Sequence, residues 1–176
     1  MDERLLAELA AYIAAHYEVE LGKLRHFRID DLRTITGPRT PSIDLLGAIN
    51  GLLSKMEDSF SERLLYLIER TGRKPAEIYT KAGVTKAHFS KIRTDKHYHP
   101  TKETALAFAI ALHLSLADAQ DLLRRAGYTL SHSSESDLIV EFFLVHRKYN
   151  VDLVNICLDH YGHKPLTNRR GSAAVE

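Results

Sequence analysis

Positively charged side chains are concentrated in one stretch of the chain, and this stretch has the residues best suited to bind a charged partner. The net charge of the 176 residues is only +1, yet residues 70–102 contain nine Lys or Arg against two Asp or Glu. Residues 1–59 contain seven basic and ten acidic side chains, and residues 129–176 contain five and six. This asymmetry indicates a polyanionic partner, with a solvated loop face as the alternative.

A tight corner at Gly83-Val84-Thr85 lies inside this stretch, between two short helical patterns at about 75–82 and about 86–94. Pro75 suits the first turn of a helix, Gly83 permits a positive φ, and Thr85 can cap the second helix. Two short helices joined in this way, the second cationic, are typical of a helix-turn-helix. The second helix of such a motif fits the major groove of DNA, where its first turn can reach base edges.

The pattern continues along residues 64–123 without a gap, about one third of the chain. This segment resembles the five-helix domain of the phage-repressor (XRE/Cro) class, which implies a DNA-binding regulator. The matching positions are Gly72, Gly83, Val84, Thr85, Phe89, Ile92, Pro100, Thr101, Leu106, Leu112, Ser115 and Leu116.

The resemblance also implies a role for each polar position around the corner. Positions in the first turn of the recognition helix and one turn later would read bases. The start of the preceding helix and the loop after the recognition helix would contact phosphates. The implied base-reading residues are Lys86, Ala87, His88 and Lys91, and the implied phosphate-binding residues are Lys74, Arg93, Lys96, His97 and Lys102.

Three positions depart from the family pattern. Lys74 and Pro75 stand where relatives usually have a polar cap followed by Gln, so the family's Gln contact to phosphate is absent. Tyr79 stands where relatives usually have Ala, at the contact between the two helices of the motif. A ring at this position is expected to widen the angle between those helices or to displace the second one.

The rest of the chain is expected to be helical, so the predicted fold is all-α: a five-helix repressor-like core extended by two N-terminal and two C-terminal helices. Apolar residues at 6, 9, 13 and 17 indicate a helix over 2–18, which could pack on its own domain or form a dimer seam. Further helices are expected at 42–56, 59–72, 101–113, 115–127, 136–148 and 151–161. The last two rest on a stripe of Leu138, Phe142, Val145 and Tyr149, and on a cap at Asn150.

The predicted organisation is an N-terminal extension at 1–58, the helix-turn-helix domain at 59–128, a C-terminal extension at 129–166 and a frayed tail at 167–176. The helix at 101–113, "TALAFAIALHL", is apolar on nearly every side, including Ala107 and Ile110. A helix of this kind is covered all round. We therefore expect an added helix, or a second subunit, to pack on it.

Other kinds of chemistry have weaker signals. Cys157, His160 and His163 are spaced like metal ligands, but a structural zinc site typically needs four, so a half-buried Cys with two surface His is preferred and no metal or cofactor is expected. No nucleophile elbow, phosphate loop or paired-carboxylate site is present in the sequence, which disfavours an enzyme. The absence of a long apolar run or basic leader, and a single Cys, favour a cytoplasmic protein with no membrane partner.

Three functions remain open from the sequence. The first is a regulator that binds double-stranded DNA as a homodimer, reading two half-sites about one DNA turn apart. The second is a protein-interaction adaptor that keeps the helix-turn-helix shape without reading DNA, with the N-terminal helices as a possible partner surface. The third is RNA or non-specific DNA binding through the basic face alone.

Overall fold

The computed structural model describes residues 8, 11–12, 57–95 and 97–167. Every regular element within these residues is helical, so the all-α prediction is confirmed for this part of the chain. No helix in it has the length and apolar character needed to cross a bilayer. The helices are α3 (Phe60–Arg70), α4 (Pro75–Lys81), α5 (Lys86–Thr94), α6 (Lys102–Ala111), α7 (Leu116–Arg125), α8 (Glu135–Val145) and α9 (Val151–His160).

Most helix starts are set by a local polar cap, as the sequence predicts. The Ser59 hydroxyl accepts the backbone N–H of Glu62, and the Glu62 carboxylate accepts the N–H of Ser59, which completes the capping box. Single side-chain oxygens begin α5, α6, α7 and α9 in the same way. These caps are Thr85, Thr101, Ser115 and Asn150.

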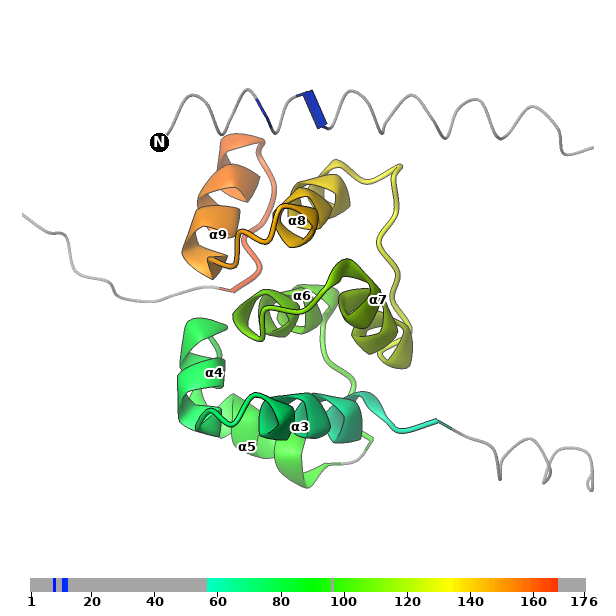
Figure 1. The fold of residues 1–176 in the computed structure, drawn as a ribbon, viewed down its shortest axis with the longest axis vertical. Helices are drawn as coiled ribbons and strands as arrows, with labels where there is room; N and C mark the ends of the chain where they lie inside the picture. The colour runs from blue at the N-terminus through cyan, green and yellow to red at the C-terminus, as the bar shows by residue number, and fades with distance from the viewer. Residues whose placement is uncertain (1–7, 9–10, 13–56, 96, 168–176) are drawn as a thin grey trace, which may run out of the picture.

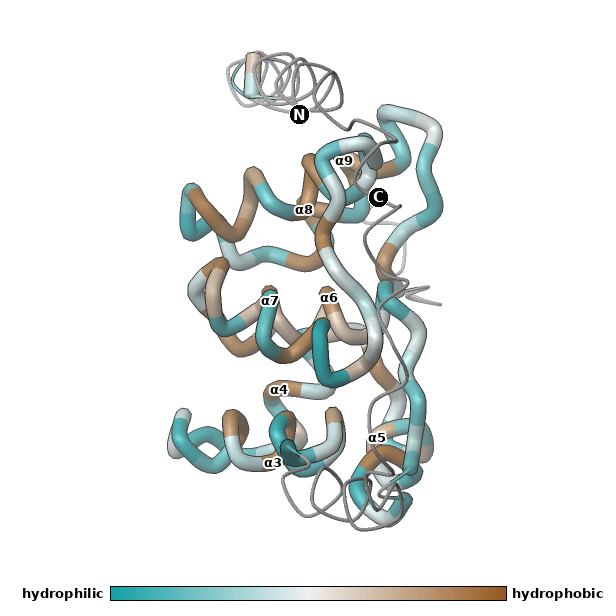
Figure 2. The backbone as a smooth tube through the Cα atoms, turned by 90° about the vertical axis from the view of Figure 1, so that its right-hand side faces the viewer, coloured by the Kyte–Doolittle hydropathy of each residue, from teal (hydrophilic) through white to brown (hydrophobic). Residues whose placement is uncertain are grey.

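The helices stack in three layers (Figure 1). At one end α3, α4 and α5 lie together, α6 and α7 form the middle, and α8 and α9 form the other end. Figure 2 shows the same stacking from the side, with α8 and α3 on opposite sides of the α6–α7 layer. The middle layer is therefore covered on both faces, which explains how seven short helices share one hydrophobic core.

Helix α6 is the centre of this stack. All its residues from Thr104 to Ala111 are buried, and Ala107 and Ile110 are completely inaccessible to solvent. The helix contacts α4 on one side and α8 and α9 on the other, in addition to α7. The cover that its all-round apolar sequence requires is therefore supplied within the chain, by α8 and α9.

Helix α8 is more deeply buried than its sequence stripe indicates. Every residue from Asp137 to Leu144 is buried, so the helix has no solvent face over these two turns. The predicted stripe was wrong at its C-terminal end: Val145 is 45% exposed, and Tyr149 lies beyond the helix. The Tyr149 hydroxyl instead donates to the carbonyl of Leu114, and its ring stacks on His113.

Two acidic side chains of α8 are buried with partners from distant segments. Asp137 accepts hydrogen bonds from the Lys102 ammonium at 2.5 Å and from the backbone N–H of Ser131 at 2.8 Å. Glu141 accepts the Tyr12 hydroxyl at 2.9 Å and faces the His132 ring at 3.1 Å. Partners of this kind offset the cost of burying a carboxylate.

The N-terminal segment is described at only three positions, all helical: Glu8, Ala11 and Tyr12. The Tyr12 ring packs edge-on against Phe142, and burial together with the bond to Glu141 raises the pKa of its hydroxyl. Part of the predicted N-terminal helix thus packs on α8. The predicted stripe at 6, 9, 13 and 17, the helix at 42–56 and the tail beyond 167 lie outside the described residues.

Candidate functional site

The position of α5 is set by its inner face. Phe89 and Ile92 are 5% and 0% exposed, and the Phe89 ring packs against Tyr79 of α4, with centroids 5.2 Å apart, and against Phe108 of α6. Tyr79 is therefore part of the contact between α4 and α5, as its place in the sequence predicts. An apolar inner face of this kind fixes the rotation of α5 about its axis.

The turn between α4 and α5 depends on Gly83. Its φ is +70°, a region that favours glycine, and the next residue, Val84, donates its N–H to the Tyr79 carbonyl and is buried. A second constraint comes from the C-terminal segment, because a Cβ on Gly83 would overlap the Thr167 hydroxyl and lie 3.1 Å from the Thr167 Cβ. Any larger residue at this position would meet both backbone strain and a steric clash.

The opposite side of α5 faces solvent. We call Lys86, Ala87, Lys91 and Arg93 the α5 outer face; all four are exposed. Three are cations, and among the described residues none of them makes an ion pair with a carboxylate. The helix thus has an anchored apolar side and an exposed cationic side.

His88, the remaining predicted base-reading residue, has a different environment. It is half-buried, and its Nε2 shares a short hydrogen bond with the hydroxyl of Tyr98 in the loop after α5. Burial, together with the nearby charge of Lys91, lowers the pKa of the His88 ring, which favours its neutral form. Only Nδ1 of His88 remains to contact a ligand, while Nε2 holds the loop against the helix.

Tyr98 is the residue at this site that sequence reasoning missed. Its ring lies edge-on to His88 and 5.8 Å from the Lys91 ammonium, so it organises two of the predicted base-reading residues. The His97-Tyr98-His99 run was visible in the sequence, but a contact ten residues along the chain has no periodic signal.

The predicted phosphate-binding residues divide into three groups. Lys74, Arg93 and His97 are exposed, at the cap of α4, on the last turn of α5 and in the loop that follows. Lys96 lies outside the described residues. Lys102 departs from its predicted role, because its side chain is only 26% exposed and its ammonium is bound to the buried Asp137.

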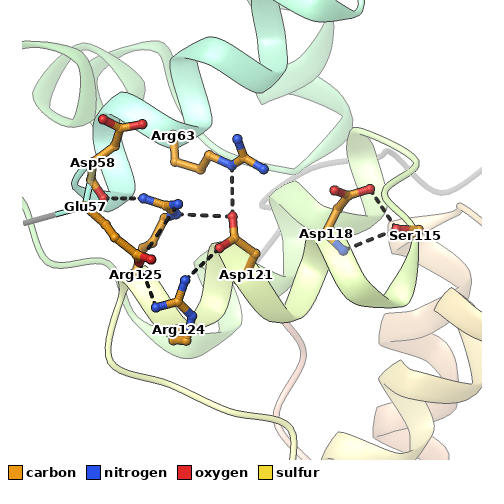
Figure 3. A network of polar contacts seen from close by, with 8 residues as sticks. All are labelled: Glu57, Asp58, Arg63, Ser115, Asp118, Asp121, Arg124 and Arg125. Carbon is orange, nitrogen blue, oxygen red and sulfur yellow. Dashed lines mark hydrogen bonds and ion pairs between the residues drawn. The ribbon is translucent and has the colours of Figure 1, made fainter.

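Several other cations of the segment 59–128 also bind carboxylates within the protein. Asp121 of α7 bonds Arg124 at 3.0 Å and Arg125 at 3.1 Å, and pairs with Arg63 of α3 at 2.9 Å (Figure 3). Burial opposes the ionisation of Asp121, but the hydrogen bonds from Arg125 and Arg124 outweigh it and hold its pKa below the usual value. This network joins α3 to α7, so its arginines belong to the framework.

The sequence-predicted candidates for metal ligands and for a reactive thiol, Cys157 and His163, have other environments in the structure. Within them, no three His, Cys, Asp or Glu side chains lie close enough together to hold a metal ion. Cys157 is fully buried, and burial raises the pKa of its thiol, which disfavours a reactive thiolate. His163 lies 2.9 Å from Glu135 instead of beside Cys157 as a ligand partner.

Comparison with known proteins gives no relative: no family model, curated protein or solved structure matches this chain. The functional assignment therefore rests on the geometry of α4, α5 and the loop around Tyr98.

Proposed function

We propose that this protein is a DNA-binding transcriptional regulator of the repressor type, in which α4 and α5 form a helix-turn-helix and α5 enters the major groove. The observation that carries the proposal is the two-sidedness of α5. Phe89 and Ile92 anchor one side, and on the other the α5 outer face presents three cations that have no carboxylate partner among the described residues. A helix held rigidly on one side can dock its free side into a groove without reorganising.

The exposed residues fall into two roles by their position on α5. Lys86, Ala87 and Lys91 lie on the first turn and one turn later, where side chains of a groove-bound helix reach base edges. Lys74, Arg93 and His97 flank this face and would contact phosphates, which supply affinity but no sequence information. Nδ1 of His88 adds one hydrogen-bonding group beside the Lys91 ammonium.

The internal use of other cations supports this division. Arg63, Arg124 and Arg125 are bound to carboxylates between α3 and α7, and Lys102 is bound to Asp137. Among the described residues, the cations of segment 59–128 that have no carboxylate partner are therefore concentrated around α4, α5 and the loop after α5. Such a concentration attracts a polyanion to the face that would read it.

The test is binding of the full chain to labelled duplexes, measured by fluorescence anisotropy at several salt concentrations, after selection of a preferred sequence from a random pool. We expect a preferred site and a steep salt dependence, with the slope reduced by about one for each phosphate-contacting cation removed. Lys86→Ala and Lys91→Ala are each expected to weaken the preferred site by about 1–3 kcal/mol and random DNA by less.

A control for the loss of charge is Lys148→Gln in the turn after α8, where the ammonium lies 3.4 Å from the Glu8 carboxylate; this layer is the one farthest from α5. It is expected to leave both affinities nearly unchanged. Equal losses on preferred and random DNA would show backbone contact only. No binding to any duplex at low salt would reject the proposal and leave the adaptor function.

The proposal includes a homodimer, since a two-fold pair of α5 helices would read two half-sites. Sedimentation of the free protein and the symmetry of the selected sequence test this part separately. A monomer bound to a single asymmetric site would reject the dimer while retaining DNA binding.

A further inference from the structure

A cavity of about 280 Å³ lies where the first turns of α6 and α8 meet the segment after α9. Its apolar lining is formed by Leu106, Val140, Leu158 and Leu166, all of them buried. Its volume is near the lower end of the range for small-molecule sites in proteins. The cavity is in the part of the molecule that covers α6, away from the α5 outer face.

Two polar contacts at this cavity are already made within the protein. Lys102 and Asp137 line it and bind each other, and Asp137 is held further by the backbone N–H of Ser131. His163 also lines it, with its Nε2 2.9 Å from the Glu135 carboxylate. Lys102 and Asp137 balance each other's charge, and the His163 ring is already hydrogen-bonded to Glu135, so these side chains have partners within the protein.

Two further charged residues of the lining are exposed and of opposite sign: Glu103 in the first turn of α6 and Lys164 after α9. Within the described part of the chain neither side chain has a hydrogen bond or ion pair. A ligand with a single negative charge would face Glu103, and one with a single positive charge would face Lys164. A ligand with both charges can satisfy both residues.

We propose that this cavity binds a small aliphatic α-amino acid. Lys164 receives the carboxylate, Glu103 receives the ammonium group, and the side chain lies on the leucine and valine lining. Ser134 and Ser136 also line the cavity, and their hydroxyls are hydrogen-bonded to each other at 3.0 Å. This inference involves no residue of α5 and stands whether or not the protein binds DNA.

Calorimetric titration of the full chain with alanine, valine and leucine tests the proposal directly, without DNA. We expect leucine to bind most tightly of the three, because each added methylene buries apolar surface on the lining. Two analogues of leucine test the charge requirement: 4-methylpentanoate, which lacks the ammonium, and 3-methylbutylamine, which lacks the carboxylate. Each is expected to bind at least about tenfold more weakly than leucine, since each leaves one protein charge unpaired.

Variants identify the site. Glu103→Gln and Lys164→Gln are each expected to weaken leucine binding about tenfold or more, while Glu69→Gln, an equivalent change on the exposed side of α3, leaves it unchanged. Circular dichroism of each variant checks that the helices are retained. The proposal is overturned if none of the three amino acids binds, if a singly charged analogue binds as tightly as leucine, or if Glu69→Gln weakens binding as much as the cavity variants.

Discussion

Helices α5 and α8 are similar in length but opposite in design. α5 buries Phe89 and Ile92 and exposes its cations, whereas α8 buries every residue from Asp137 to Leu144, including two carboxylates. The charged residues of α5 have no carboxylate partner within the described residues, while those of α8 are bound to Lys102, His132 and Tyr12. Residue type alone therefore does not reveal whether a charge is available to a partner.

The two helices therefore have different tasks: α5 is proposed to bind a partner, and α8 supports the fold. Removing a side chain from the outer face of α5 should change binding and leave the fold intact. Removing one from α8 should change the fold. The following predictions, in order of decreasing effect, test this contrast.

Deletion of residues 130–176 is expected to have the largest effect. It removes α8 and α9 and exposes the side of α6 that they cover, so the remaining chain should aggregate or lose cooperative unfolding. Thermal unfolding followed by circular dichroism, together with gel filtration, measures both outcomes. A truncated protein as stable as the full chain would contradict the claim that α8 and α9 are needed to cover α6.

Phe143→Ala in α8 is expected to lower the free energy of unfolding by about 3–5 kcal/mol, because the ring is completely buried. Lys91→Ala in α5 is expected to change it by no more than about 0.5 kcal/mol. Urea denaturation of both variants measures the difference. Similar losses in the two proteins would remove the distinction between the two helices.

Asp137→Ala is expected to cost about 1–3 kcal/mol, since it leaves the Lys102 ammonium and the Ser131 N–H without their shared acceptor. Glu77→Ala also removes one negative charge, from the exposed first turn of α4, and serves as the control. It should cost no more than about 0.5 kcal/mol. Equal losses in urea denaturation would show that the pair of Lys102 and Asp137 adds nothing beyond an exposed carboxylate.

A smaller loss of stability is expected when Asp121 is protonated at low pH, because the folded-state pKa of this residue is held below its usual value. Its stabilising contribution is present above the unfolded-state pKa of about 4 and is lost as the pH falls through the folded-state value. Denaturation from pH 6 to pH 2 should show a weaker pH dependence in Asp121→Asn than in the unchanged protein. Identical pH profiles would exclude Asp121 as a source of acid sensitivity.

Local signals in the sequence account for most helix starts. Caps at Ser59, Thr85, Thr101, Ser115 and Asn150 act on the next three residues, so their effect can be predicted without knowing the fold. Helix ends marked by glycine were predicted nearly as well. The left-handed glycines are Gly72, Gly83, Gly127 and Gly162, each with φ between 65° and 75°.

Four helices, α3, α6, α7 and α8, end two or three residues before the predicted position, and at two of these ends no glycine is involved. α6 ends at Ala111 instead of 113, and α8 ends at Val145 instead of 148. In both cases the left-handed residue that follows is not glycine: it is His113 with φ of 58° or Arg147 with φ of 54°. Tertiary contacts, such as the stacking of His113 on Tyr149, hold a conformation that the residue type does not indicate.

In the candidate site, the exposed positions were predicted from the sequence, but two long-range contacts were not. The exposed positions of α5 followed from helical periodicity, because Phe89 and Ile92 identify the buried side. The bond between His88 and Tyr98 and the pairing of Lys102 with Asp137 join residues 10 and 35 positions apart. No pattern of spacing encodes such contacts, so the environment of His88 and the internal use of Lys102 required coordinates.

The path of the chain after α9 links two regions that are otherwise separate. Leu166 lines the cavity, and the adjacent residue, Thr167, lies against Gly83 at the junction of α4 and α5. One peptide unit therefore joins the two, with no free space at the glycine to absorb a shift. Suppose that a ligand in the cavity shifts Leu166 and Thr167 and thereby changes the affinity of α5 for its own partner. Binding of that partner must then change the affinity of the cavity for its ligand by the same factor.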